Sequence, residues 1–341
     1  MSIIGIDIGF GYTKATDGTK EIIFKSVLGE AAEIQFQDEL FPSKKQEFLS
    51  ITIDGKNYFV GDLAERQSNV RLFTLDQTQF IAQFAKVLAL VGLGNLVENF
   101  ENVSVITGLP VGYYKQFKDA LATNLLGEHK FSFLKSNGEE IEKNITIGKV
   151  RIIPQPYGSL LNIFLDDEGK VKNADFFKQK VGVIDIGFRT TDYIVSDKLQ
   201  YSERGSKTTD NGISKAFSVI SNKLREKSGV NVEIFKLYEY LTKGTVKIKG
   251  KEYDLTGIRE QVLQQLAAQI ASDAERFWVD DWDMDSILIS GGGGALLEKY
   301  LRPLLPSATP VFNPAEDGRF FNVKGYLKYG KSIWFGEKEA K

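Results

Sequence analysis

Two spacings of apolar residues divide the chain into predicted helices and strands. Apolar residues recur three or four positions apart in several segments, which is the period of an amphipathic helix. Shorter runs of branched and aromatic residues indicate buried strands. The helices are predicted over 80–91, 113–126, 160–164, 213–224, 258–277 and from 325, and the strands near 1–27, 51–60, 103–107, 181–193, 246–253 and 286–289. The mixture predicts an α/β protein.

One pentapeptide occurs twice, about half the chain apart. Ile6–Phe10 and Ile184–Phe188 both read Ile-Asp-Ile-Gly-Phe. Each copy ends a β-rich apolar run and leads through a turn into a second strand-like stretch. Taken singly, each copy could be a buried strand with a chance Asp-x-Gly turn. As a pair, they predict a duplicated architecture.

The repeated segment has the chemistry of a phosphate-binding turn. A glycine directly after the strand lets the backbone approach a ligand, and consecutive turn amides form an anion-binding concavity. Two such hairpins would clamp a polyphosphate. Asp7 and Asp185 would then face the same phosphates and repel them, unless a hard cation lay between. Magnesium that keeps several of its waters fits this role.

A third glycine-rich segment follows the apolar run at 286–289. Ser290-Gly291-Gly292-Gly293-Gly294 opens a helix-like stretch, so strand, glycine turn and helix N-terminus follow one another. This order provides an anion or nucleotide platform. A tight strand-to-helix turn explains the four glycines equally well when they are taken alone.

Composition excludes several other kinds of chemistry. The 341 residues include 43 Lys and Arg, 45 Asp and Glu, no Cys and one His, giving a formal net charge of −2. Disulfides, thiolate chemistry and multi-His metal sites are therefore excluded, and a reducing cytoplasm suits the chain. The near-neutral charge predicts no direct contact with nucleic acid or a membrane. His129 precedes an alternating segment, and we interpret it as a surface residue.

The three glycine elements, in this order, resemble the phosphate-one, phosphate-two and adenosine motifs of the superfamily that joins actin, the heat-shock chaperone ATPases and sugar kinases. Within it the chain resembles ParM-type plasmid-segregation actins and the related archaeal actin-like ATPases. Lys25 stands where that family usually has proline. Further matching segments are Phe24–Val27, Asp54–Ala64, Thr107–Pro110, Pro154–Gly158, Arg189–Asp192, Asn313–Asp317 and Val323–Tyr326.

The resemblance implies a role for each motif. Asp7 and Asp185 would hold a hydrated Mg²⁺ through water, and Lys14 would contact phosphate. The remaining nucleotide contacts would come from the first turn (Gly9, Phe10, Gly11, Tyr12), the second turn (Gly187, Phe188, Arg189, Thr190) and the adenosine motif (Gly291, Gly292, Gly293). The side chains that would clamp adenine, expected between 211 and 244, are left unassigned.

Gln155 falls where the resemblance places the residue that orients the attacking water. A glutamine can position water but is no general base, so hydrolysis would depend on alignment and electrostatics. The alternative is that Gln155 is only a turn residue between two prolines.

The resemblance implies an actin-like, ribonuclease H-like fold of two duplicated lobes around a nucleotide cleft. We expect the first lobe to comprise 1–158 plus 325–341 and the second 159–324. The expected function is ATP binding and hydrolysis, with ADP as product, coupled to filament assembly for plasmid segregation or another cytoskeletal task. The partners would be further copies of the chain and a DNA-binding adaptor protein. A metabolite kinase and a non-hydrolysing nucleotide-binding scaffold are the alternatives, because fold alone does not imply function.

Overall fold

The chain folds into two compact units. The first comprises residues 1–109, 113–173 and 322–341, and the second comprises 110–112 and 174–321. The structure is a computed structural model. It describes residues 2–31, 49–134, 139–172, 174–305, 308–310 and 317–339. The segment Asn313–Glu316, which contributed to the family resemblance, lies outside the described residues.

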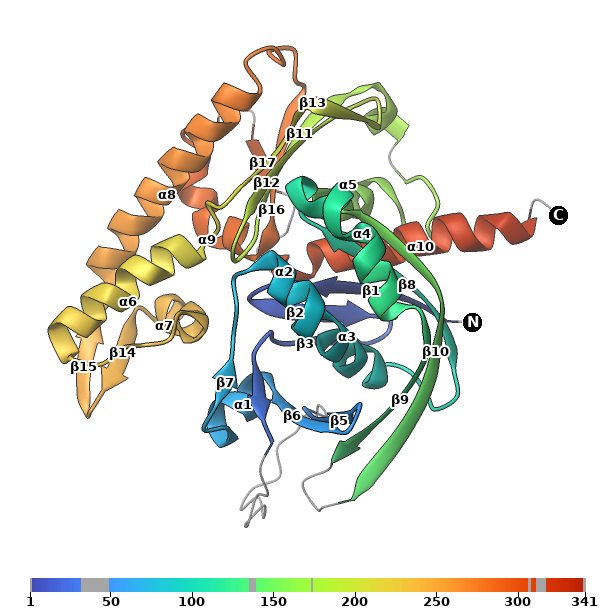
Figure 1. Ribbon diagram of the computed structural model, residues 1–341. Coiled ribbons are helices and arrows are strands. Elements are labelled where there is room, and N and C mark those ends of the chain that lie inside the picture. The colour runs from blue at the N-terminus through green and yellow to red at the C-terminus, as the bar shows by residue number, and fades with distance from the viewer. Residues whose placement is uncertain are drawn as a thin grey trace. The chain divides into compact units, whose positions relative to one another are not determined.

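The first unit contains a ten-stranded mixed sheet in the order β3-β2-β1-β8-β10-β9-β5-β6-β4-β7 (Figure 1). Strands β1 and β2 form an antiparallel hairpin, and β8 is parallel to both β1 and β10. In chain order the strands are β1 (Ser2–Ile8), β2 (Tyr12–Thr16), β3 (Glu21–Lys25), β4 (Leu28–Glu30), β5 (Ser50–Ile53), β6 (Lys56–Val60), β7 (Arg71–Leu72), β8 (Asn102–Leu109), β9 (Gly127–Leu134) and β10 (Glu140–Pro154).

Helix α3 lies closely against the first hairpin. Nearly every residue of this helix is buried, and a Cβ atom on Gly92 would lie 3.2 Å from the Ile6 side chain. Such an approach holds β1 and β2 in place from one face of the sheet. The helices of the unit are α1 (Gly61–Gln67), α2 (Gln77–Gln79), α3 (Ala85–Gly94), α4 (Val111–Leu125), α5 (Pro156–Phe164) and α10 (Phe321–Glu339), with a π-helical turn at Phe80–Phe84.

Helices α5 and α10 pack so closely that their backbones nearly touch at Gly158. A Cβ atom on Gly158 would lie 2.6 Å from the Asn322 carbonyl oxygen, so only glycine fits there. The Ser159 hydroxyl also donates a hydrogen bond to Asn322 Oδ1 at 2.7 Å, and both side chains are buried. These contacts place α5 in the first unit, which extends to residue 173, whereas the sequence analysis ended the first lobe at 158.

The second unit is built on a five-stranded sheet in the order β13-β12-β11-β16-β17. Its strands are β11 (Lys180–Ile186), β12 (Thr191–Asp197), β13 (Gln200–Thr209), β16 (Ser286–Ser290) and β17 (Ala308–Pro310), and β14 (Thr245–Ile248) and β15 (Lys251–Asp254) form a separate hairpin. Its helices are α6 (Ser214–Ser228), α7 (Leu237–Lys243), α8 (Thr256–Phe277) and α9 (Gly291–Leu301). Tyr193 is fully buried in its core, with edge-on contacts to Phe277 and Trp278.

The predicted strands and helices are confirmed, including the 246–253 hairpin and the long helix over 258–277. The interpretation of His129 as a surface residue is wrong. It lies in β9, is buried, and its Nε2 atom donates to the Leu125 carbonyl at 2.7 Å. Burial lowers its pKa. The alternation of β9 puts His129 on the buried face with Phe131 and Phe133, and the Leu125 carbonyl, not solvent, satisfies the imidazole.

Lys25, the departure from the family pattern, is also buried and ion-paired. Its Nζ atom lies 3.1 Å from carboxylate oxygens of both Asp62 and Glu65. Burial alone would lower the Lys25 pKa, but the two carboxylates raise it above its ordinary value. The lysine therefore ties β3 to α1. Among the described residues, no helix is long and apolar enough to cross a membrane.

Candidate functional site

The first hairpin places Asp7 and Lys14 opposite each other. They are cross-strand partners in β1 and β2, and Lys14 Nζ lies 2.8 Å from Asp7 Oδ2. Both side chains are largely buried, so each charge requires the other. A Cβ atom on Gly9 would lie 3.4 Å from Lys14 Nζ, which places the ammonium group directly against the turn.

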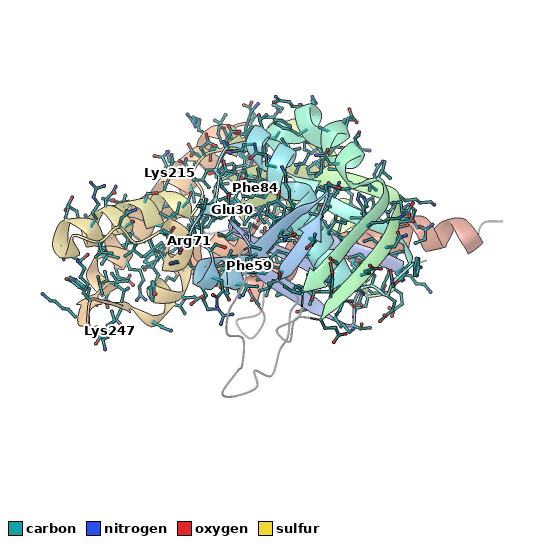
Figure 2. The ribbon with its side chains drawn as sticks, turned by 60° about the horizontal axis from the view of Figure 1, so that its bottom comes forward. Glu30, Phe59, Arg71, Phe84, Lys215 and Lys247 are labelled. Atoms are coloured by element: carbon teal, nitrogen blue, oxygen red, sulfur yellow. The ribbon has the colours of Figure 1, made fainter. Side chains whose placement is uncertain are left out.

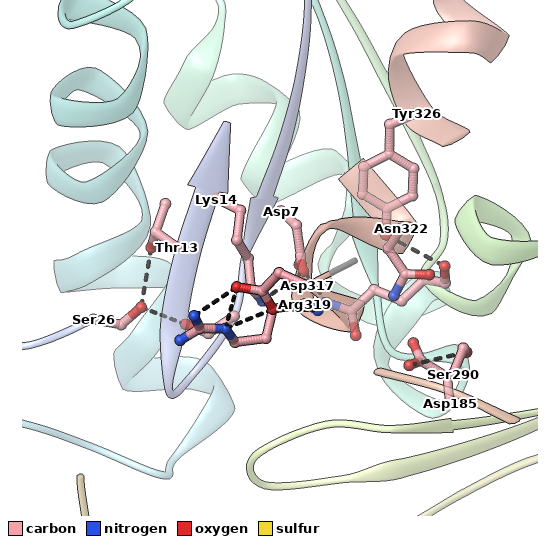
Figure 3. A network of polar contacts seen from close by, with 12 residues as sticks. Asp7, Thr13, Lys14, Ser26, Asp185, Ser290, Asp317, Arg319, Asn322 and Tyr326 are labelled. Carbon is pink, nitrogen blue, oxygen red and sulfur yellow. Dashed lines mark hydrogen bonds and ion pairs between the residues drawn. The ribbon is translucent and has the colours of Figure 1, made fainter. Parts of the chain in front are cut away.

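Ser26 holds the turn between these strands. Its hydroxyl donates to the Gly9 carbonyl at 2.5 Å, and its amide donates to the Gly11 carbonyl at 3.0 Å. Since the single Ser26 hydroxyl proton goes to Gly9, Thr13 must donate the 3.0 Å bond that joins the two hydroxyls (Figure 3). Every peptide bond in the described part of the chain is trans. The amides of Phe10 and Tyr12 therefore point away from Ser26, as a phosphate-binding turn requires.

The side chain of Phe10 anchors the same turn in the core. It is buried, and its ring centroid lies 4.4 Å from that of Phe80. Phe80 begins the π-helical turn and stacks in turn on Phe84. Phe10 can therefore offer a ligand only its backbone, which is the part that the sequence analysis assigned to phosphate.

Gln155 reaches the same carboxylate from another element. It lies between β10 and α5, and its Nε2 atom is 3.5 Å from Asp7 Oδ1, while Lys14 contacts Oδ2. Its side chain makes no capping bond to α5. A turn role therefore explains the backbone of Gln155 but not the direction of its amide group. The structure brings together Asp7, Lys14 and Gln155 within the first unit.

Gly108 makes room for this arrangement. A Cβ atom at this position would overlap Tyr326 Oη and would lie 2.9 Å from Gln155 Cγ. The Tyr326 hydroxyl donates to the Gln155 carbonyl at 3.4 Å. The glycine of the Gly-Leu-Pro segment is therefore needed for close packing beside Gln155.

The second hairpin uses a different support for its turn. The carbonyls of Gly187, Phe188 and Arg189 accept hydrogen bonds from the amides of Ile213, Ser214 and Gly212, respectively, at 2.8–3.1 Å. A Cβ atom on Gly212 would overlap the Arg189 backbone, so this contact requires glycine. Because trans peptide groups point N–H opposite to C=O, the amides of residues 188–190 face away from α6.

Arg189 is the one charged side chain of this turn. Its guanidinium lies 3.4 Å from Asp210. Thr190 is buried, and its hydroxyl lies 3.4 Å from Asp192. The side chains of both residues are thus directed to protein partners, and their backbone amides are the groups available for an anion.

Asp192 is a buried carboxylate whose part the sequence analysis left unassigned. It is 2% exposed and is the cross-strand partner of Asp185. It accepts hydrogen bonds from the Thr208 hydroxyl and, at 2.8 Å, from the amide of Val111, in the segment 110–112 of this unit. Burial raises the Asp192 pKa to about 7, and the negative charge of Asp185 adds to the effect.

The glycine-rich segment packs directly on the second hairpin. Gly291 has a φ of +82°, and a Cβ atom there would overlap Asp185 Oδ1. A Cβ atom on Gly293 would lie 2.6 Å from the Ile186 side chain. The Ser290 hydroxyl donates to Asp185 Oδ1 at 3.3 Å (Figure 3). The predicted adenosine motif therefore packs against the end of β11, directly before the second predicted phosphate turn.

Two side chains beside Gly292 were missed by the sequence analysis. A Cβ atom on Gly292 would lie 3.1 Å from the Arg319 side chain. Asp317 holds the Arg319 guanidinium through contacts of 2.6–3.0 Å, and the guanidinium lies 5.3 Å from the ring centroid of Tyr238. A flat guanidinium stacked on an aromatic ring next to a glycine turn is suited to contact a base. Only the fold joins these residues, so no sequence spacing indicated them.

The donor groups fit a hydrated magnesium ion. Asp7 and Asp185 supply hard carboxylate oxygens, which Mg²⁺ prefers. No cluster of three or more metal-ligating side chains occurs among the residues that the structure describes. A cation that keeps most of its waters needs only one or two carboxylates, whereas a fully dehydrated ion needs a cage.

Two protein-family models match the two halves of the chain. A family model of the actin-like protein N-terminal domain matches residues 5–158, and one of the archaeal MreB-like actin homologue C-terminal domain matches 183–303. These matches and the fold define an actin-like protein. The chain belongs to the actin-like ATPase superfamily.

Solved structures agree over nearly the whole chain. A non-polymerisable quadruple mutant of pCBH ParM is 25% identical with a TM-score of 0.81, and covers 97% of this chain and 99% of its own. A 15-stranded ParM filament from Clostridium botulinum gives the same values. Ta0583, an archaeal actin homologue also solved with ADP, is 20% identical with a TM-score of 0.78 and full coverage of both chains. No curated protein sequence matches the chain.

Proposed function

We propose that this protein binds ATP with Mg²⁺, hydrolyses it, and assembles into nucleotide-dependent filaments. The observation that carries the proposal is the Asp7 carboxylate, which contacts the predicted phosphate lysine Lys14 at one oxygen and the predicted water-orienting Gln155 at the other. A buried carboxylate, an ammonium group and an amide thus meet beside a glycine turn. This combination suits phosphoryl chemistry that depends on positioning and electrostatics.

Each hairpin would contribute amides to the phosphates. The turn held by Ser26 would bind the β-phosphate, and the turn held by residues 212–214 would cover the γ-phosphate. Gly292 and the Arg319–Tyr238 stack would contact the adenosine part. Magnesium would supply charge neutralisation of the phosphates, and Asp7 and Asp185 would hold it through water. Gln155 would orient the attacking water.

Filament assembly is supported by the relatives named above, one of which is a ParM filament and another a ParM mutant described as non-polymerisable. Plasmid segregation through a DNA-binding adaptor is the task that we propose for these filaments. Assembly would follow ATP binding, because a nucleotide can shift a conformational equilibrium only as far as it prefers one state.

Light scattering and phosphate release, recorded together, test the proposal. Particle size should grow with ATP or a slowly hydrolysed analogue, and not with nucleotide and EDTA. Asp7→Asn should weaken nucleotide binding in calorimetry and reduce its magnesium dependence. Asp54→Asn, which removes an exposed carboxylate of the same unit, should behave as wild type. Growth in particle size that is equal without nucleotide would contradict the proposal, and phosphate release with no growth in particle size would contradict its filament part.

A further inference from the structure

Asn211 directly precedes the three residues whose amides hold the second turn. A side chain that caps a helix comes from the N-cap residue, which is Ile213 for α6, so Asn211 lies outside the capping position. Its Nδ2 atom instead donates to Asp273 Oδ2 of α8 at 2.6 Å. Its carbonyl accepts from the buried Thr191 hydroxyl of β12 at 2.9 Å. Asn211 therefore joins α8 and β12 to the segment that supports the turn.

Asp273 is a carboxylate among the buried residues of α8, where it is 4% exposed. Besides Asn211, it contacts Gln269 at 3.2 Å and Arg276 at 2.8 Å. Burying a charge is costly unless it is paired and hydrogen-bonded. Gln269 and Arg276 belong to α8 itself, whereas Asn211 is 62 positions away in sequence. Of these three contacts, the bond to Asn211 is therefore the one that ties α8 to another element.

Partners on both sides fix the direction of the Asn211 amide. Lys215, an exposed residue of α6 that is labelled in Figure 2, donates from Nζ to Asn211 Oδ1 at 2.7 Å. An ammonium group can only donate and a carboxylate can only accept. The amide oxygen must therefore face Lys215, and the amide nitrogen must face Asp273. The amide group cannot turn over without losing both bonds.

Residues 212–214 follow Asn211 directly, so its position constrains theirs. The Gly212 amide donates to the Arg189 carbonyl at 2.9 Å, and a Cβ atom on Gly212 would overlap the Arg189 backbone. The two segments therefore have no free space between them. A displacement of Asn211 would be passed to the peptide groups of the second turn, and so to the amides of residues 188–190, which the proposed function assigns to the γ-phosphate.

We propose that Asn211 is a positioning residue for the γ-phosphate, and that its bond to Asp273 makes the second turn depend on the position of α8. This inference rests on the proposed function, since it requires that the second turn covers the γ-phosphate of ATP. ADP has no γ-phosphate. Loss of the bond should therefore weaken binding of the triphosphate and slow its hydrolysis, but leave ADP binding unchanged. A residue needed only for folding would affect both nucleotides equally.

Asn211→Ala removes the amide and keeps the carbonyl that accepts from Thr191. Calorimetry with Mg²⁺, at a protein concentration that light scattering shows to be free of filaments, measures its nucleotide affinity. The Kd for a slowly hydrolysed ATP analogue should rise by about 5–30-fold and phosphate release at saturating ATP should fall by about 10–100-fold, with the Kd for ADP within about twofold of wild type. Asn222→Ala, which removes an exposed asparagine of α6, should behave as wild type.

Exchanging the two groups tests the bond itself. Asn211→Asp alone sets a second carboxylate against Asp273 and should raise the Kd for the analogue by at least the factor found for Asn211→Ala. Adding Asp273→Asn re-forms the bond with donor and acceptor exchanged, and Lys215 can pair with the carboxylate now at 211. The Kd of the double variant for the analogue should therefore return to within about threefold of wild type.

The outcomes separate this inference from the proposed function. An unchanged Kd for the analogue in Asn211→Ala, an ADP Kd that rises by the same factor, or a double variant that binds no better than Asn211→Asp would overturn the inference and leave the proposed function intact. Urea denaturation shows which variants are folded, and the two Kd values of Asn211→Ala decide the question if Asn211→Asp unfolds. A wild-type chain that binds neither nucleotide would instead overturn the proposed function.

Discussion

Replacing Asp192 by asparagine should change how the stability of the protein depends on pH. Asp192 is fully buried beside Asp185, and its pKa is raised from 3.8 to about 7. The folded state holds this proton more tightly than the unfolded state. The protonated Asp192 therefore contributes to the free energy of unfolding fully below pH 4, and this contribution is lost as the pH rises to 7. At about 1.4 kcal/mol for each pKa unit, the total loss is about 4 kcal/mol.

Between pH 5 and pH 8 the two titrations give a loss of about 2–3 kcal/mol in the wild type. The asparagine side chain would keep an oxygen to accept from the Val111 amide and the Thr208 hydroxyl, but it cannot ionise. The free energy of unfolding of Asp192→Asn, relative to wild type, should therefore rise by that amount over this range.

Urea denaturation of the nucleotide-free protein in EDTA, monitored at several pH values, measures this difference. Subtracting the free energy of unfolding of the wild type at each pH removes the contribution of all other carboxylates. Asp197→Asn, at the exposed end of the same strand, should follow the wild-type profile. If Asp192→Asn also followed wild type within about 0.5 kcal/mol from pH 5 to pH 8, burial would not be raising the pKa of Asp192.

Three further substitutions test separate parts of the site. Gln155→Ala should keep nucleotide affinity and slow phosphate release by about 10–10³-fold, since it removes only a positioning group; wild-type hydrolysis would return Gln155 to a turn role. Ser26→Ala should weaken ATP binding and lower the free energy of unfolding by about 1–3 kcal/mol, because it removes the hydroxyl that holds Gly9, and calorimetry with urea denaturation measures both. Arg319→Ala should raise the Kd for ATP by about 5–30-fold through loss of its stack on Tyr238, with Arg319→Lys as the variant that keeps the charge but not the plane.

Local patterns were sufficient to predict the framework of the site. The repeated pentapeptide located both hairpins, and the spacing of apolar residues located the helices beside them, because period and turn chemistry are properties of neighbouring residues. The π-helical turn at Phe80–Phe84 was predicted only as helix. The packing of Phe80 against Phe10 joins segments that are distant in sequence, and the spacing of apolar residues does not predict such contacts.

The groups that hold the turns were not predictable in this way. No sequence pattern marks Gly212, whose contact with the Arg189 backbone forms only when α6 lies beside the second turn. Tyr238 and Arg319 lie far apart in the sequence and meet only in the folded unit. The buried His129 bonds to the Leu125 carbonyl at the end of α4, which comes within reach only because the chain turns there into β9.

The two identical pentapeptides are supported by unlike means, and this difference has a consequence for function. In the first turn, the hydroxyl and amide of Ser26 hold the Gly9 and Gly11 carbonyls, and the Phe10 ring packs on Phe80. The carbonyls of the second turn are held by the backbone amides of residues 212–214, directly before and at the start of α6. Its geometry instead follows the position of α6, a helix packed in the core of the second unit. Movement of α6 would therefore change the second turn directly, whereas the first turn would keep its form as long as Ser26 stayed bonded to Gly9.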